Sequence, residues 1–119
     1  MFVEPNNILF TDKGKGITQR MLGYHSQLMA VEMTFQKGSS MPPHSHADHV
    51  QGIYIVKGSF KITCGEVTRV MKAGEMCYAD KGEIHGTYCL EDQSILLDIH
   101  SPMRADILEE GLNYNSQKR

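Results

Sequence analysis

Apolar and polar residues alternate along several short stretches of this chain, which is the pattern of β-strands with one buried face. Within residues 28–35, Met29, Val31, Met33 and Phe35 fall on the same face. Further runs of this kind occupy residues 53–56, 60–63, 67–71, 76–79, 84–90 and 94–100. They recur at turn spacings of about 8–12 residues, and glycines stand between them. The pattern predicts an all-β barrel or sandwich.

Helical periodicity is weak throughout the sequence. Only residues 103–112 favour a helix, and for no more than one or two turns. The last stretch, residues 113–119, is polar and is expected to be a disordered tail. A chain of 119 residues is large enough for one core, so we expect a single domain over residues 1–112.

Composition excludes several classes of partner. The net charge is −2, and no basic run is present, which argues against nucleic acid or an anionic membrane surface. We see no secretory signal at the N-terminus and no apolar stretch of membrane-spanning length. Cys64, Cys77 and Cys89 are odd in number and widely spaced, so we expect free thiols and a cytoplasmic protein.

Two glycine-bounded motifs carry the candidate chemistry. The first, G-x5-H-x-H-x4-Q-x6-G, contains His44, His46 and Gln51, and the second, G-x5-D-x-G-x2-H, ends at His85. Alternate side chains of a strand share a face, so His44 and His46 can point the same way, while His85 must come from another strand. Imidazole nitrogens and an amide oxygen are ligands for transition metals. The motifs predict one divalent ion, Ni, Fe, Mn or Zn.

Together the two motifs resemble those of the cupin superfamily. The resemblance implies a double-stranded β-helix, or jelly-roll barrel, with the metal in its mouth. Gln51 stands where many cupins carry Glu, and Asp80 stands where many carry Pro. Without an anionic protein ligand, the ion would keep more positive charge for a substrate carboxylate or enolate.

A narrower resemblance covers most of residues 16–108. Residues 22–24, 27–32, 58–60 and 97–104, together with the His-x-His…Gln arrangement, look like the KdgF proteins of pectin and alginate breakdown. Those small cupins convert cyclic 4,5-unsaturated uronate monosaccharides into linear keto-uronates. The resemblance implies a small anionic sugar-acid substrate, with Asp98 and Arg104 acting on it. His100 would line the substrate site, where relatives tend to have a larger aromatic residue.

Strand alternation adds to this assignment. Leu96, Asp98 and His100 share one strand face, which places Asp98 near the metal if that face is the inner one. The alternative is that Asp98 lies on the rim and pairs with Arg104. His49 is two residues before Gln51, so on a strand it would share the face of Gln51 and could compete for the metal. Its position among the four residues between His46 and Gln51 favours a loop instead.

The leading functional hypothesis is a metal-dependent sugar-acid isomerase that opens the ring of an unsaturated uronate. One alternative is a three-histidine iron dioxygenase, and another is a non-catalytic cupin that binds a small ligand. We also expect a homodimer. Small cupins generally pair, and the face formed by residues 29, 31, 33 and 35 offers more apolar area than one narrow barrel needs.

Overall fold

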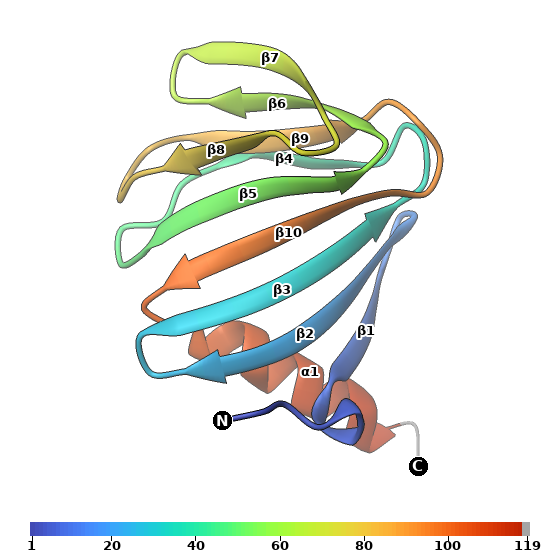
Figure 1. Cartoon of the computed structure of the whole chain (residues 1–119), viewed down its shortest axis with the longest axis vertical. Coiled ribbons are helices and arrows are strands. Elements are labelled where there is room, and N and C mark those ends of the chain that lie inside the picture. Colours follow the sequence, from blue (N-terminus) through green and yellow to red (C-terminus); the bar gives the residue numbers. More distant parts are fainter. Residues whose placement is uncertain (118–119) are drawn as a thin grey trace.

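The computed structural model describes residues 1–117, which form two antiparallel β-sheets and one C-terminal helix (Figure 1). The larger sheet has the order β1 (Leu9–Gly14), β2 (Ile17–His25), β3 (Leu28–Phe35), β10 (Ser94–Ser101), β5 (Val50–Lys57) and β8 (Met76–Ala79). The smaller sheet has the order β4 (Ser40–His44), β9 (His85–Cys89), β6 (Ser59–Cys64) and β7 (Val67–Lys72). A short 3-10 turn, η1 (Pro5–Asn7), precedes β1.

The inner faces of the two sheets enclose the core. Phe35 from the larger sheet and Phe60 from the smaller one meet edge to face, with ring centroids 5.1 Å apart. Both side chains are fully buried, as are Ile53 and Ile55 on β5. Burying such large apolar side chains between two sheets is the main source of stability for a jelly-roll barrel. The expected all-β fold is confirmed.

All seven stretches predicted as strands overlap strands of the structure. The alternating apolar face of β3 is correctly predicted. This face packs inside the barrel, however, and not against a second copy of the chain. Met29, Val31, Met33 and Phe35 are between 0% and 4% exposed, because β3 is a central strand whose inner face lines the barrel interior. The apolar area that motivated a homodimer is therefore already buried within one chain.

The C-terminal helix is longer than expected. Helix α1 (Ala105–Gln117) has 13 residues, so residues 113–117 are helical and not a disordered tail; residues 118–119 lie outside the described part of the chain. Contacts with the strands stabilise it. Ile107 enters the core, Gly111 packs against Leu9, and the Asn115 amide donates to the Phe10 carbonyl at 2.9 Å.

The three cysteines are free thiols, as expected. Cys89 lies at the far end of β9 from His85, where its Sγ is 2.9 Å from the Glu91 carbonyl oxygen. Among residues 1–117, no helix has both the length and the apolar character that a membrane crossing needs.

Candidate metal centre

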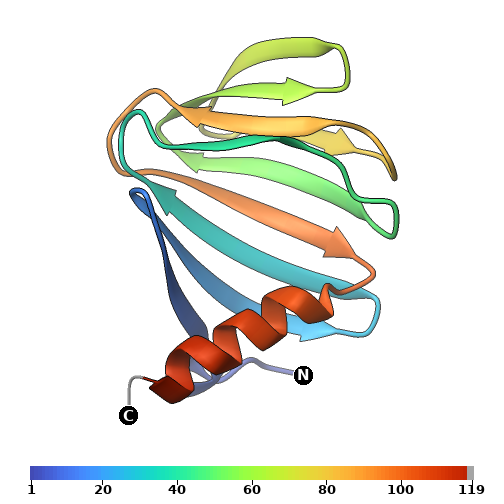
Figure 2. The same cartoon turned by 180° about the vertical axis from the view of Figure 1, so that it is seen from behind.

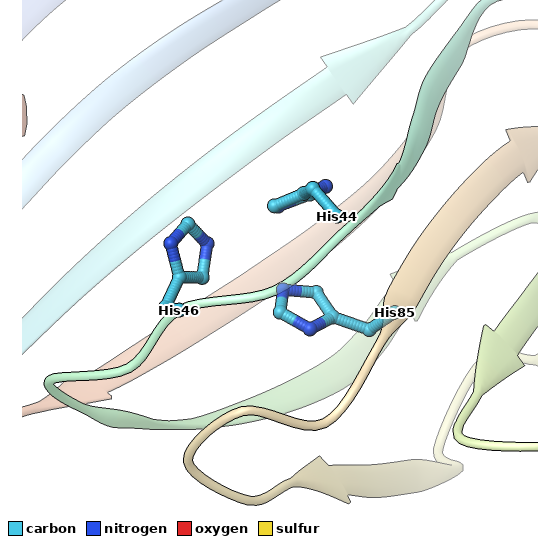
Figure 3. A group of neighbouring side chains, drawn as sticks. All are labelled: His44, His46 and His85. Carbon is cyan, nitrogen blue, oxygen red and sulfur yellow. The ribbon is translucent and has the colours of Figure 1, made fainter.

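Three histidine side chains converge at one end of the barrel (Figure 3). His44, His46 and His85 each present a ring nitrogen, and the three nitrogens all lie within 4.8 Å of one another. The ring centroids of His44 and His85 are 4.4 Å apart, and those of His44 and His46 are 4.8 Å apart. Three imidazole nitrogens at this separation can share one ion as ligands.

The pairing of β4 with β9 places His44 directly opposite His85. The register shifts between Met41 and His44, where Pro42 and Pro43 interrupt the strand. Proline has no N–H to donate to a neighbouring strand, so this segment cannot form a regular ladder. A Cβ at Gly86 would lie only 2.9 Å from the Pro43 nitrogen. The glycine therefore permits the close backbone approach that brings the two histidines together.

His46 reaches the cluster by a different route from the one expected. It does not share a strand with His44, because β4 ends at His44 and His46 lies in the following loop. The His46 carbonyl accepts a 2.7 Å hydrogen bond from the Gly82 amide, in the turn that leads to His85. Gly82 has a φ of +76°, a conformation that costs glycine little. This hydrogen bond therefore connects the loop that carries His46 with the turn that precedes His85.

Backbone carbonyls fix which ring nitrogen faces the cluster. His44 Nδ1 lies 2.8 Å from the Pro42 carbonyl, and His85 Nδ1 lies 3.0 Å from the Glu83 carbonyl. A carbonyl only accepts, so each Nδ1 must carry the proton and each Nε2 keeps its lone pair. Nε2 of both His46 and His85 is buried and has no hydrogen-bond partner among the described residues. Orphaned, oriented imidazole nitrogens of this kind fit a metal ion.

The environment of His46 and His85 favours the neutral imidazole, which is the form that binds metals. Burial, and next the charge of Arg104, lowers the pKa of His46 to about 4. Burial also lowers the pKa of His85, partly opposed by its hydrogen bond to Glu83.

Gln51, on β5, presents the fourth expected ligand atom. Its Oε1 is buried and has no hydrogen-bond partner within residues 1–117, and the side chain lines the same cavity as the three histidines. A buried amide oxygen without a hydrogen bond is costly unless something binds it. The donor set of three imidazoles and one amide oxygen therefore fits a divalent transition metal.

The cavity has a volume of about 400 Å³ and continues from the histidines into the barrel. Leu96, Asp98 and His100 all line it, so the predicted inner face of β10 is correct. Asp98 Oδ1 is buried and has no hydrogen-bond partner in the part of the chain that the structure describes. Burial raises the pKa of Asp98 to about 7, while a hydrogen bond from Gln51 and the charge of Arg104 act in the opposite direction.

Arg104 lines the same cavity from the segment just before α1. Its Nη2 is 2.7 Å and its Nε 3.2 Å from the carboxylate oxygens of Asp106. Asp98 therefore does not form the rim ion pair with Arg104 that was the alternative interpretation. Arg104 retains Nη1 and the second Nη2 hydrogen for a ligand.

Two further histidines lie near the candidate metal centre, His100 in the cavity wall and His49 against the rings of His46 and His100. His100 is 1% exposed and lines the cavity, and its buried Nδ1 has no partner among residues 1–117. Burial lowers the pKa of His100 to about 3. His49 lies in the loop between β4 and β5, as expected. Its ring centroid is 4.4 Å from that of His46 and 5.1 Å from that of His100. The contact of His49 with these two rings could not be predicted from strand alternation, because alternation does not fix the direction of a side chain in a loop.

Comparison with known proteins agrees with this geometry. The family model "Cupin domain" matches residues 31–100, which include all four candidate ligands. A curated relative, the pectin degradation protein KdgF of Dickeya dadantii (strain 3937), is 39% identical over 95 residues, which are 80% of this chain and 86% of that protein. The chain belongs to the KdgF group of the cupin family.

Solved structures of cupins support the same placement. KdgF from Halomonas sp. superposes with a TM-score of 0.84 at 30% identity, covering 90% of this chain and 99% of that one. An RmlC-like cupin from Shewanella frigidimarina NCIMB 400 gives 0.81 at 34% identity, covering 89% and 94%. The jelly-roll fold expected from the glycine-bounded motifs is confirmed.

Proposed function

We propose that this KdgF-like cupin opens the ring of a 4,5-unsaturated uronate monosaccharide and releases the linear keto-uronate. One observation supports this most strongly. Asp98 lines the same cavity as the histidine cluster and Arg104, and one of its carboxyl oxygens is buried with no partner among the described residues. An acid–base group, a candidate Lewis-acid site and an anion-binding group thus share one cavity, which is what this reaction needs.

His44, His46, Gln51 and His85 are the ligands we propose for one divalent ion, Ni, Fe, Mn or Zn. Such an ion would bind the ring nitrogens of the three histidines and the buried amide oxygen of Gln51. When bound, the metal supplies Lewis-acid stabilisation of the negative charge that develops on a substrate oxygen.

Asp98 is the group we propose for proton transfer. It takes the proton of the anomeric hydroxyl as the bond between C1 and the ring oxygen breaks, which leaves an aldehyde at C1 and an enolate at C4–C5. Asp98 then returns that proton to C4, and C5 becomes a ketone. The atoms balance, since the step is an isomerisation. A single carboxyl at the cavity wall serves both transfers.

Arg104 is proposed to hold the substrate carboxylate through two parallel N–H donors, with His100 lining the substrate site. Arg104→Lys is expected to raise KM by about tenfold and change kcat less, because charge remains while the two-pronged contact is lost. Steady-state kinetics at equal metal loading measure this. An unchanged KM would remove Arg104 from substrate binding.

A cytoplasmic homodimer is part of the proposal. The inner face of β3 cannot contribute to it, so the contact surface must lie elsewhere. Light scattering at micromolar protein concentration is expected to report twice the 13.4 kDa chain mass. A monomer mass would refute the dimer and leave the fold and the site as they are.

One assay tests the activity directly. Metal-loaded protein is expected to accelerate the loss of the ultraviolet absorbance of unsaturated galacturonate, because ring opening removes the conjugated double bond. Protein treated with a chelator serves as the control. Turnover without oxygen separates this isomerase from the iron dioxygenase alternative. Should the protein leave the absorbance decaying at the buffer rate, the isomerase proposal fails.

A further inference from the structure

Three polar side chains from three elements meet beside α1. Lys13 on β1 and Glu110 on α1 form an ion pair of 3.1 Å, and the Gln19 amide on β2 donates to the same Glu110 oxygen at 3.2 Å. Figure 2 shows α1 lying across β1 and β2, and the helix contacts both strands. We call these three residues the Lys13–Gln19–Glu110 cluster.

The cluster lines the same cavity as the histidines and Asp98. Glu110 comes four residues after Asp106, the partner of Arg104, which corresponds to about 6 Å along the helix. The cavity therefore has polar groups in two places, the candidate metal centre with Arg104 and the cluster about one helical turn away. Apolar side chains such as Val31, Met33 and Leu96 form other parts of its wall.

We propose that the Lys13–Gln19–Glu110 cluster recognises the hydroxyl groups of the sugar acid and selects among its stereoisomers. This inference rests on the proposed function, which assigns the substrate's carboxylate to Arg104 and its reacting atoms to Asp98. The hydroxyls on C2 and C3 are then left to be recognised. A hydroxyl both donates and accepts, and the cluster offers the complementary pair of an ammonium donor and a carboxylate acceptor.

Gln19 is the residue of the cluster whose burial points most directly to hydroxyl recognition. It is 3% exposed, and the hydrogen bond to Glu110 uses only one of its two amide hydrogens. Gln19 lines the cavity, where a sugar hydroxyl can bond to the second amide hydrogen or to the amide oxygen. Lys13 and Glu110 are partly exposed, so Gln19 is the buried member of the cluster. A wrongly placed hydroxyl leaves this buried amide without a partner, and Gln19 is therefore the residue expected to discriminate.

Attachment of α1 does not by itself require this cluster. The helix is already held by Ile107 in the core, by packing of Gly111 on Leu9, and by the Asn115 hydrogen bond to Phe10. An apolar side chain at position 19 would serve such an attachment equally well. Asn115 is therefore a useful control, because it fixes the helix but does not line the cavity.

Gln19→Met keeps the length of the side chain and removes its amide. The substrates are unsaturated galacturonate and its C2 epimer, which differ in the configuration of one hydroxyl. We expect KM for the preferred substrate to rise about 3- to 10-fold, the size of one lost hydrogen bond, and the ratio of kcat/KM between the epimers to move towards one. Glu110→Gln, which keeps the shape, is expected to act in the same direction. Metal content should stay at the wild-type value.

Asn115→Ala is expected to lower Tm without changing KM or the epimer ratio. Equal KM increases in Gln19→Met and Asn115→Ala would overturn the proposal, because the cluster would then only hold the helix. An unchanged KM and epimer ratio in Gln19→Met would overturn it as well.

Failure of the proposed function would look different, since the wild-type protein would turn over neither epimer. In that case calorimetry with D-galacturonate and the metal-loaded proteins decides the question. Weaker binding to Gln19→Met than to wild type supports hydroxyl recognition, whereas equal affinity, or no binding to either, overturns it.

Discussion

Replacing Asp98 with Asn is expected to lower turnover of unsaturated galacturonate by about 10²–10⁴-fold, with metal content and fold unchanged. The amide has nearly the shape of the carboxyl but cannot take up or release the proton. Asp98 Oδ1 is a buried atom of the cavity wall without a partner among the described residues, and Asp98 lies on the strand that pairs with the Gln51 strand. No other carboxylate on the inner face of β10 can replace it.

The measurement is kcat at saturating substrate, with both proteins loaded to the same metal content. Asp12→Asn makes the same chemical change at an exposed position of β1 outside the cavity and is expected to behave as wild type. If Asp98→Asn also turns over at the wild-type rate, the acid–base role is wrong. Asp98 would then only orient Gln51, with which it shares a hydrogen bond.

The sequence predicts the parts of this site that depend on strand alternation. Alternation places Leu96, Asp98 and His100 on one face of β10, and the structure confirms that all three line the cavity. The same rule identifies the buried face of β3 but not what covers it. An apolar strand face looks the same whether it meets the opposite sheet of its own chain or a second copy.

Features that depend on contacts distant in sequence escaped prediction. His46 reaches the other two histidines of the candidate metal centre from a loop. A hydrogen bond from the Gly82 amide holds this loop, and no local sequence pattern reveals that bond. Helix α1 extends to Gln117 although its sequence is polar, because packing against β1 stabilises it more than an apolar stripe of its own. The Lys13–Glu110 ion pair spans 97 residues, so it becomes visible only when α1 is placed on the barrel.

The convergence of the three histidines was predicted from their spacing, and this agreement has a physical reason. The glycines and prolines of the motifs set backbone geometry where the ligands lie. Gly86 lets β4 approach β9, and the break at Pro42 and Pro43 accompanies the register shift that brings His44 opposite His85. The same short segments therefore contain both the candidate ligands and the residues that set the backbone geometry around them.

His85→Ala is expected to lose most of the bound metal, from about one ion per chain to a small fraction of that. His44 and His46 come from one segment of the chain, so His85 is the histidine that closes the site from another strand. Its Nδ1 is held by the Glu83 carbonyl, so its Nε2 is already oriented and little entropy is lost on binding. Removing it leaves two imidazoles and one neutral amide, a much weaker set of donors.

Elemental analysis of protein purified without chelator measures the metal content, and His25→Ala is the matched control. His25 is exposed and is the last residue of β2, and it is not part of the histidine group that His85 joins, so this variant is expected to keep the full metal content. A second readout is thermal: adding metal at 100 times its Kd should stabilise wild type by about 2.7 kcal/mol, and His85→Ala much less. Full metal content in His85→Ala would contradict the assignment, because an ion held equally well without His85 cannot be bound between β4 and β9.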